Sequence, residues 1–328
     1  MRLLKQIFVL LLVVVLFAAF NFGMYTLLTC RLANNFSGAT QAKMVDVEAY
    51  LPHREESDLV RIESSLRLTE ELPVLDGAAA LLPVYAAFVN AVYPEGSVTF
   101  EGGEFSDDNF YGENFAPDSK MQYKNTVRGY KAIVDGETDI LFCAAPSAEQ
   151  RAYAEEKGVE LVYVPVGREA FVFFVNGNNP VDSLTVSEVR GIYSGQYTDW
   201  SQLGGPKRII NPVTRLKGSG SQSAMDAFMG DVPIGGKSPF AIFGGSIGFS
   251  FRYYMDGIVD NDNVKMISLN GVYPSAENIK NGTYPIIAEF YAVYRKDNSN
   301  PNVPVLIEWI LSPEGQYIIE ESGYVGIR

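Results

Sequence analysis

The sequence is poor in the side chains that most often carry out chemistry. In 328 residues there are only two cysteines, Cys30 and Cys143, and a single histidine, His53. Two cysteines cannot supply a disulfide framework, and Cys143, which ends an apolar run, is predicted to be a small buried side chain. A lone histidine outside the predicted strands and helices leaves a Ser-His-Asp triad without its base. We therefore expect a protein that is not an enzyme and that needs no cofactor.

Positive charge is also scarce. The chain has 26 Lys and Arg against 39 Asp and Glu, a formal net charge of -13, and no cluster of basic residues. A nucleic-acid interface needs such a cluster, so we expect no nucleic-acid partner. A small anionic ligand is compatible with this negative net charge, because a few local dipoles and one arginine can bind an anion within an acidic protein. The acidic stretch from Asp107 to Asp118 resembles a calcium loop only loosely, since Tyr111 stands where an oxygen ligand is needed. We predict no metal site.

One long apolar run stands at the N-terminus. Residues 7–28 are almost entirely apolar and follow Arg2 and Lys5. A run of this length suits a bilayer, and the positive charges before it favour export of the rest of the chain. The tetrapeptide Leu27-Leu28-Thr29-Cys30 resembles a lipobox, with threonine in place of the usual smaller residue, and no A-x-A cleavage site follows the run. Two alternatives stay open, an uncleaved membrane anchor and a lipoprotein signal that leaves Cys30 lipidated. Both predict an extracytoplasmic domain tethered to the cell membrane.

Strands and helices alternate through the rest of the chain. The length exceeds that of one simple doubly-wound domain, so two lobes are expected. A polar, irregular stretch at residues 31–69 is predicted to be a stalk. Apolar runs and helical stripes then predict strands at 72–75, 139–143, 159–164 and 170–175, and helices at 78–92, 126–134, 149–157, 187–193, 224–229, 305–311 and from Pro313 to a stop at Gly323. This order predicts an α/β fold with mostly parallel sheets, which bind ligands at the carboxyl ends of their strands.

The turn from Arg215 to Ser223 is the best candidate for a ligand site. It is rich in glycine and serine and leads into a predicted helix, so the backbone N–H groups of a helix N-terminus can approach an oxyanion. Ser219 and Ser221 can donate hydroxyl hydrogens, and Arg215 offers a planar fork that matches phosphate, sulfate or carboxylate. An ordinary helix cap is the alternative, because Ser223 and Asp226 have capping-box spacing.

Several ordered stretches resemble a known family. The glycine turn at residues 77–83 comes first. Three stretches precede the main turn: Asn179-Pro180-Val181-Asp182-Ser183-Leu184-Thr185, Ile192-Tyr193-Ser194-Gly195 and Asp199-Trp200-Ser201-Gln202-Leu203-Gly204-Gly205. The main turn, Arg215 with Ser219-Gly220-Ser221, is followed by Ile247-Gly248-Phe249, Gly271-Val272-Tyr273-Pro274-Ser275, Ile279-Lys280-Asn281-Gly282-Thr283-Tyr284-Pro285 and Ser312-Pro313-Glu314-Gly315-Gln316. From about Leu72 to Arg328 the chain is similar to the phosphate-binding proteins of ABC-type phosphate importers, within the type II periplasmic binding protein family. That resemblance implies an oxyanion ligand, with phosphate first, and ABC permease subunits as partners.

The same resemblance implies a division of the chain and a set of ligand-binding residues. Residues 1–30 are the signal or anchor and 31–69 the stalk; residues 70–167 plus 290–328 form lobe I, and 168–289 form lobe II. Hinge strands join the lobes, and the ligand lies between them. The implied ligand-binding residues are Arg215, Ser219, Gly220 and Ser221 in the main turn, Thr126 in a second turn, and the backbone of Ala78 and Ala79 in the first turn.

Departures from the family pattern keep a second function open. Ala78 and Ala79 stand where the family usually offers hydroxyl groups, and Ala144 stands where some phosphate binders place a proton-accepting aspartate. The first hypothesis is capture of an oxyanion for an ABC importer. The alternative is a membrane-tethered sensor or scaffold whose site is degenerate or serves another ligand. Arg252 and the aromatic residues around it are expected to belong to core and lobe-interface packing, with a second cation in the cleft as the alternative. Arg168, next to Glu169 at the expected hinge, is expected to be paired structurally and not to bind the ligand.

Overall fold

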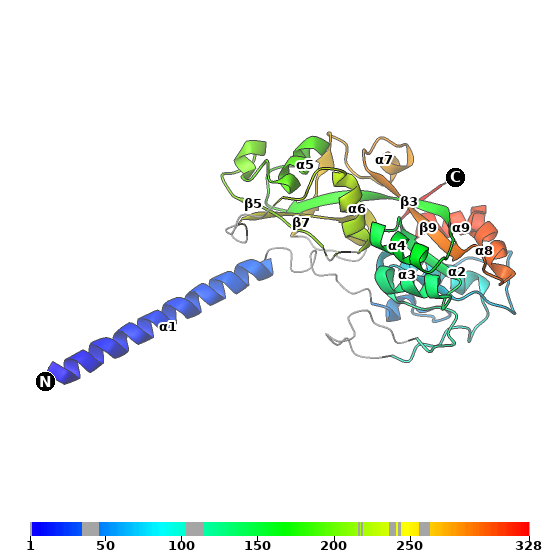
Figure 1. Ribbon diagram of the computed structural model, residues 1–328, viewed down its shortest axis with the longest axis horizontal. Helices are drawn as coiled ribbons and strands as arrows, with labels where there is room; N and C mark the ends of the chain where they lie inside the picture. The colour runs from blue at the N-terminus through cyan, green and yellow to red at the C-terminus, as the bar shows by residue number, and fades with distance from the viewer. Residues whose placement is uncertain are drawn as a thin grey trace.

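A single mixed sheet runs through the folded part of the molecule (Figure 1). The computed structural model describes residues 2–34, 46–102, 115–215, 217, 219–235, 241, 244–255 and 263–327. Its strands pair in the order β1-β2-β9-β3-β6-β5, and β10 and β7 also pair with β3. Their bounds are β1 Leu75–Gly77, β2 Ile140–Ala144, β3 Leu161–Asn176, β5 Ile210–Pro212, β6 Gly245–Phe251, β7 Val264–Met266, β9 Ile287–Arg295 and β10 Val325–Gly326. A separate pair consists of β4, Ser183–Leu184, and β8, Ser268–Leu269.

Strand β3 is shared by two halves of this sheet. Its first part, from Leu161 to Ala170, pairs with β9, which pairs in turn with β2 and so with β1; we call this group, with β10, the first half. Its second part, from Phe171 to Asn176, pairs with β6 and β7, and with β5 through β6; this is the second half. The sequence predicted two strands here, and the structure shows one, with an irregularity between Pro165 and Gly167.

The direction of the strands differs from the prediction of mostly parallel sheets. In the described part of the chain, β1-β2, β5-β6 and β4-β8 are parallel, whereas every strand that pairs with β3 or β9 does so antiparallel. The physical reason is topological. β9 enters from late in the chain and lies between β2 and β3, so the centre of the sheet is antiparallel while its edges follow the expected strand-helix-strand pattern. The expected α/β class is confirmed.

Helices cover both halves of the sheet (Figure 1). Their bounds are α1 Arg2–Asn34, α2 Leu82–Val92, α3 Asn125–Asp135, α4 Ala148–Glu156, α5 Val186–Ser194, α6 Gly220–Met229, α7 Ala276–Lys280, α8 Asn302–Ile310 and α9 Pro313–Glu321, with 3-10 turns η1 Glu48–Tyr50, η2 Ala79–Leu81 and η3 Trp200–Leu203. Local sequence explains several ends. Capping boxes at Ser147 and Thr185 start α4 and α5, and Gly136 and Gly195, both at positive φ, end α3 and α5.

The segment predicted to be a stalk is partly integrated into the fold. Residues 46–69 are mostly irregular, as expected, but Val47, Leu51, Leu59 and Leu68 are buried in the hydrophobic core. The backbone N–H of His53 donates to the Asn90 side chain of α2 at 2.8 Å, and that of Leu68 donates to the carbonyl of Val92 at 3.0 Å. This part of the segment therefore packs on the first half of the molecule instead of spacing it from a membrane.

Helix α1 carries the apolar run of the N-terminus. Its large apolar side chains from Leu10 to Phe22 are between 48% and 69% exposed. By the joint criteria of length and apolar content, no helix in the described ranges qualifies as one that could cross a membrane.

Candidate anion-binding site

The starts of three helical segments meet at the carboxyl ends of β1 and β2. The segments are η2 with α2, which follows β1, α3, and α6 of the second half. The N–H of Ala79 in η2 donates to the side-chain oxygen of Asn125, the first residue of α3, at 3.5 Å. A Cβ placed on Gly220, the first residue of α6, would lie 3.7 Å from the hydroxyl oxygen of Thr126. Helix starts present unsatisfied N–H groups and the positive end of a dipole, so this meeting point favours an anion.

The first turn needs its glycine but uses one of its predicted donors elsewhere. A Cβ on Gly77 would lie 2.5 Å from a ring carbon of Tyr85, so a larger residue would push the turn off the helix. The N–H of Ala78 donates to the carbonyl of Phe142 at 2.8 Å and thereby extends the pairing of β1 with β2. Of the two alanines, Ala79 is the one whose N–H lies at the meeting point.

The second turn is built around Asn125, which adopts φ 61°. Asparagine tolerates this left-handed conformation better than most residues. Its side-chain oxygen accepts from the N–H of Thr126 at 2.7 Å and from the hydroxyl of Thr126 at 3.5 Å. Thr126 is almost fully buried, so its hydroxyl is largely shielded from bulk water.

Asp76, which was not among the site residues predicted from the sequence, joins the first two turns. This residue is 0% exposed, and its Oδ1 accepts from the N–H of Gly77 at 2.7 Å and from the N–H of Lys124 at 2.9 Å. Burial and, after it, the charge of Asp76 raise the pKa of Cys143 to about 12, so the thiol stays protonated. The available signal was an acidic residue that ends an otherwise apolar strand directly before a glycine turn.

The main turn begins α6 earlier than the sequence predicted. The helix starts at Gly220, not near residue 224, and Ser219 is its N-cap, with a hydroxyl that accepts from the N–H of Gln222 at 3.3 Å. That hydroxyl keeps its own hydrogen for donation. Gln222 also accepts from the N–H of Arg215 at 2.8 Å, so the loop is fixed to the helix. Gly220 and Ser221 are the first two residues of α6, as the predicted oxyanion turn requires.

Two arginines near the site differ in their surroundings. The guanidinium carbon of Arg215 lies 5.9 Å from the centre of the Tyr254 ring, a contact that orients the cation. Arg252 instead forms an ion pair with the buried carboxylate of Glu169, with Nε and Oε1 3.5 Å apart. Arg168 is the neighbour of Glu169 in β3, and neighbouring residues of a strand point to opposite faces. The expectation that Arg252 has a packing role is therefore consistent with its position.

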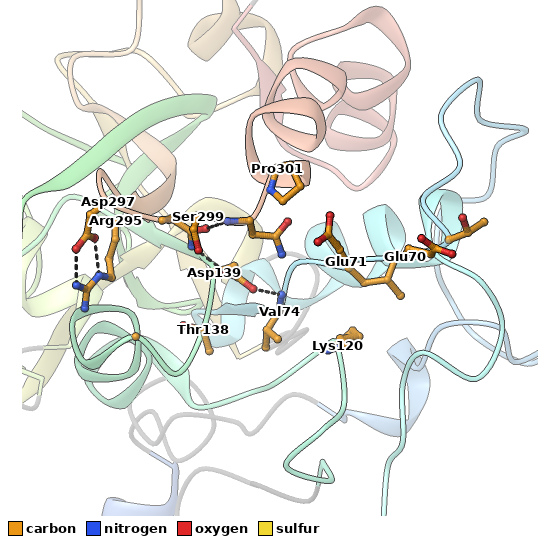
Figure 2. A pocket seen from close by; sticks show the side chains of 15 residues that line it. Glu70, Glu71, Val74, Lys120, Thr138, Asp139, Arg295, Asp297, Ser299 and Pro301 are labelled. Atoms are coloured by element: carbon orange, nitrogen blue, oxygen red, sulfur yellow. Dashed lines mark hydrogen bonds and ion pairs between the residues drawn. The ribbon is translucent and has the colours of Figure 1, made fainter.

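Two other regions of the chain contain groups of polar side chains. Most of the stretch with the loose calcium-loop pattern, Asp107 to Asp118, lies outside the described residues, which resume at Phe115. Among the described residues, no group of three His, Cys, Asp or Glu side chains could hold a metal. A polar hollow of about 800 Å³ opens at the amino ends of β1 and β2 (Figure 2). There, Asp139 accepts from the N–H of Val74 and from Asn298, both at 2.8 Å, and Arg295 pairs with Asp297. This hollow is at the edge opposite the candidate site, and its best-placed charges are used to hold the loop after β9.

Comparisons with known proteins identify the family of this chain. A family model described as a PBP superfamily domain matches residues 109–314. The chain is 27% identical to protein SphX of Synechococcus elongatus over 79% of its own length and 87% of that protein, and 26% identical to the phosphate-binding protein PstS of Bacillus subtilis over 66% and 74%.

Solved structures share the fold. A putative phosphate ABC transporter substrate-binding protein with bound phosphate from Clostridium perfringens has a TM-score of 0.56 at 22% identity, with 80% of this chain and 100% of that chain covered. An ABC-type phosphate transport receptor from Vibrio cholerae has a TM-score of 0.51 at 18% identity, with 79% and 99% covered. Because the family model matches well over half of the chain, the protein belongs to the PBP superfamily domain family of substrate-binding proteins.

Proposed function

We propose that this protein is an extracytoplasmic solute-binding protein, without enzymatic activity, that captures a small oxyanion, phosphate first, for an ABC importer. The observation that carries the proposal is the approach of Gly220 at the start of α6 to Thr126 at the start of α3, because the two residues come from different halves of the sheet. An anion between them receives donors from both halves, so binding favours the closed arrangement. The relatives named as phosphate-binding proteins support the choice of ligand.

Each residue of the site has a distinct part in this proposal. The N–H groups at Ala79, Gly220 and Ser221 supply aligned donors without a net charge. The hydroxyls of Thr126, Ser219 and Ser221 add donors that can rotate toward the ligand. Arg215 supplies the one full positive charge and a planar pair of N–H groups.

The proposed lobes follow the two halves of the sheet, except that residues 168–170 of β3 and 287–289 of β9 fall in lobe II. Lobe I takes residues 70–167 and 290–328, joined by the packed part of residues 46–69, and lobe II takes residues 168–289. The hinge lies where β3 and β9 leave the first half, near Gly167, where a Cβ would come within 2.2 Å of the Phe290 ring. This tight contact supports a glycine at the point where the strand must bend.

We also propose that the N-terminal segment keeps the protein at the membrane, either through α1 or through a lipid on Cys30. The run of exposed apolar side chains on α1 and the basic residues before it support this. Cell fractionation and labelling with a radioactive fatty acid, on the wild type and on Cys30→Ser, separate the two forms. Loss of label with release from the membrane identifies the lipid; retention of Cys30→Ser in the membrane identifies the helix, and a wild type found in the soluble fraction contradicts the tether.

Isothermal titration of the full chain in mild detergent, stripped of bound anion, tests the ligand. Heat with phosphate and little with sulfate supports an importer receptor. No heat with either anion contradicts the proposal and favours the sensor or scaffold function, which the alanines at positions 78, 79 and 144 had kept open.

A further inference from the structure

The donors of the candidate site already have an acceptor within this chain. Asn125 directs its side-chain oxygen at the N–H of Ala79 from the first turn, and at the N–H and hydroxyl of Thr126 from the second turn. These three donors come from two separate helix starts, and they converge on one amide oxygen. A carbonyl oxygen carries a partial negative charge, so it occupies the donors in the way that one oxygen of an oxyanion would.

We propose that the Asn125 side chain is a displaceable occupant of the anion site, a neutral acceptor that a ligand has to replace before it can bind. The inference rests on the proposed function, because it concerns the same donors. Without the ligand, the amide oxygen prevents buried N–H groups from being left without a partner. When a ligand arrives, rotation of the side chain transfers the donors to it.

The distances show that this occupant is weakly held. Only the contact with the Thr126 N–H, at 2.7 Å, is short, whereas the other two are 3.5 Å, at the limit for a hydrogen bond. A charged oxygen makes stronger hydrogen bonds than a neutral amide oxygen, so an anion displaces the side chain, and a neutral carbonyl or hydroxyl solute gains nothing by replacing it. Asn125 therefore selects for charge at a site whose first turn lacks side-chain hydroxyls.

The backbone at this position allows a clean test. Because Asn125 has φ 61°, glycine fits the conformation and removes the oxygen without added strain. Asn270 is a matched control. It also has a positive φ, 51°, and its side chain also accepts from a backbone N–H, that of Val186. Asn270 directly follows β8 of the separate β4-β8 pair and does not belong to any of the three helix starts.

The experiment compares phosphate binding by the full chain in detergent for the wild type, Asn125→Gly, Asn125→Ala and Asn270→Gly, by titration calorimetry and stopped-flow association. If the amide oxygen competes with the ligand, its removal raises the affinity by roughly threefold to tenfold and speeds association. The alanine variant removes the same oxygen and serves if the glycine variant does not fold. The Asn270→Gly variant is expected to match the wild type.

The outcomes separate the two proposals. Phosphate binding by the wild type, with equal or weaker binding by Asn125→Gly and Asn125→Ala, overturns the inference about Asn125 and leaves the proposed function intact. No phosphate binding by any variant, Asn125→Gly included, overturns the proposed function and the inference with it.

Discussion

Asp76 shows how one buried carboxylate can set the geometry of a site without touching the ligand. Its single oxygen Oδ1 accepts from the N–H groups of Gly77 and Lys124, which belong to the first and second turns. Both donors point inward, so the carboxylate fixes the separation of the two helix starts. The sequence marks Asp76 only as an acidic residue before a glycine turn and does not reveal its partner, because Lys124 lies 48 positions away in the chain.

Truncation of Asp76 is expected to destabilise the protein. Asp76→Ala leaves two N–H groups without their acceptor in the interior, and each costs about 1–3 kcal/mol, so the free energy of unfolding falls by about 2–6 kcal/mol. Urea unfolding followed by circular dichroism measures this change. Asp76→Asn keeps an acceptor oxygen and is the control with a smaller loss; a change below about 1 kcal/mol for the alanine variant would show that water replaces the carboxylate.

Arg215 is the residue on which affinity depends most. It supplies the charge of the site, and a charged hydrogen bond contributes about 1.5–3 kcal/mol. Arg215→Ala is therefore expected to weaken phosphate binding roughly 10- to 100-fold in calorimetric titration, whereas Arg215→Lys, which keeps the charge but loses the fork, falls in between. Unchanged affinity in the alanine variant would remove the main turn from the site.

At the scale of elements, the sequence predicted most helices and strands but not how they connect. Helical stripes and glycine stops located α3, α4 and α5 to within one residue, because those signals are local. Contacts between distant residues decide that β3 is continuous and that β9 lies at the centre of the sheet, and local patterns do not contain this information. Pro165 and Gly167 inside β3 are residues that commonly end a strand, so the sequence predicted two strands there. The same limit applies to the site. The glycine-serine turn is visible in the sequence, whereas the use of the Ala78 N–H by Phe142 is not.

Residues 46–68 are an element whose attachment is expected to depend on pH. Burial lowers the pKa of His53 below its usual value near 6.5. The folded state therefore binds a proton less readily than the unfolded state, and the stability that neutral His53 contributes is present above about pH 6.5 and is lost as the pH falls through the lowered value. Urea unfolding at pH 7 and pH 5 is expected to show a smaller loss for His53→Asn, which tolerates the positive φ of this position, than for the wild type. An identical pH dependence in both proteins would contradict this assignment.

At the scale of the whole molecule, ligand binding is expected to stabilise both halves together. The candidate donors come from η2 and α3 of the first half and from α6 of the second, so the ligand binds only when both are folded. At a phosphate concentration of about 100 times the dissociation constant, binding adds about 2.7 kcal/mol to the free energy of unfolding. Differential scanning calorimetry of the stripped protein, with and without phosphate, measures the shift. Sulfate at the same ionic strength is the control, and an equal shift with sulfate would indicate an unselective site.

The unbroken course of β3 has a consequence for folding. Strand β9 pairs with the first part of β3, and strand β6 pairs with the second part of β3. Unfolding of β3 therefore removes a hydrogen-bonded neighbour from both halves at once. A flexible linker between two domains would let each melt on its own. A shared central strand instead couples them, and the body of the molecule behaves as one cooperative unit with a single thermal transition.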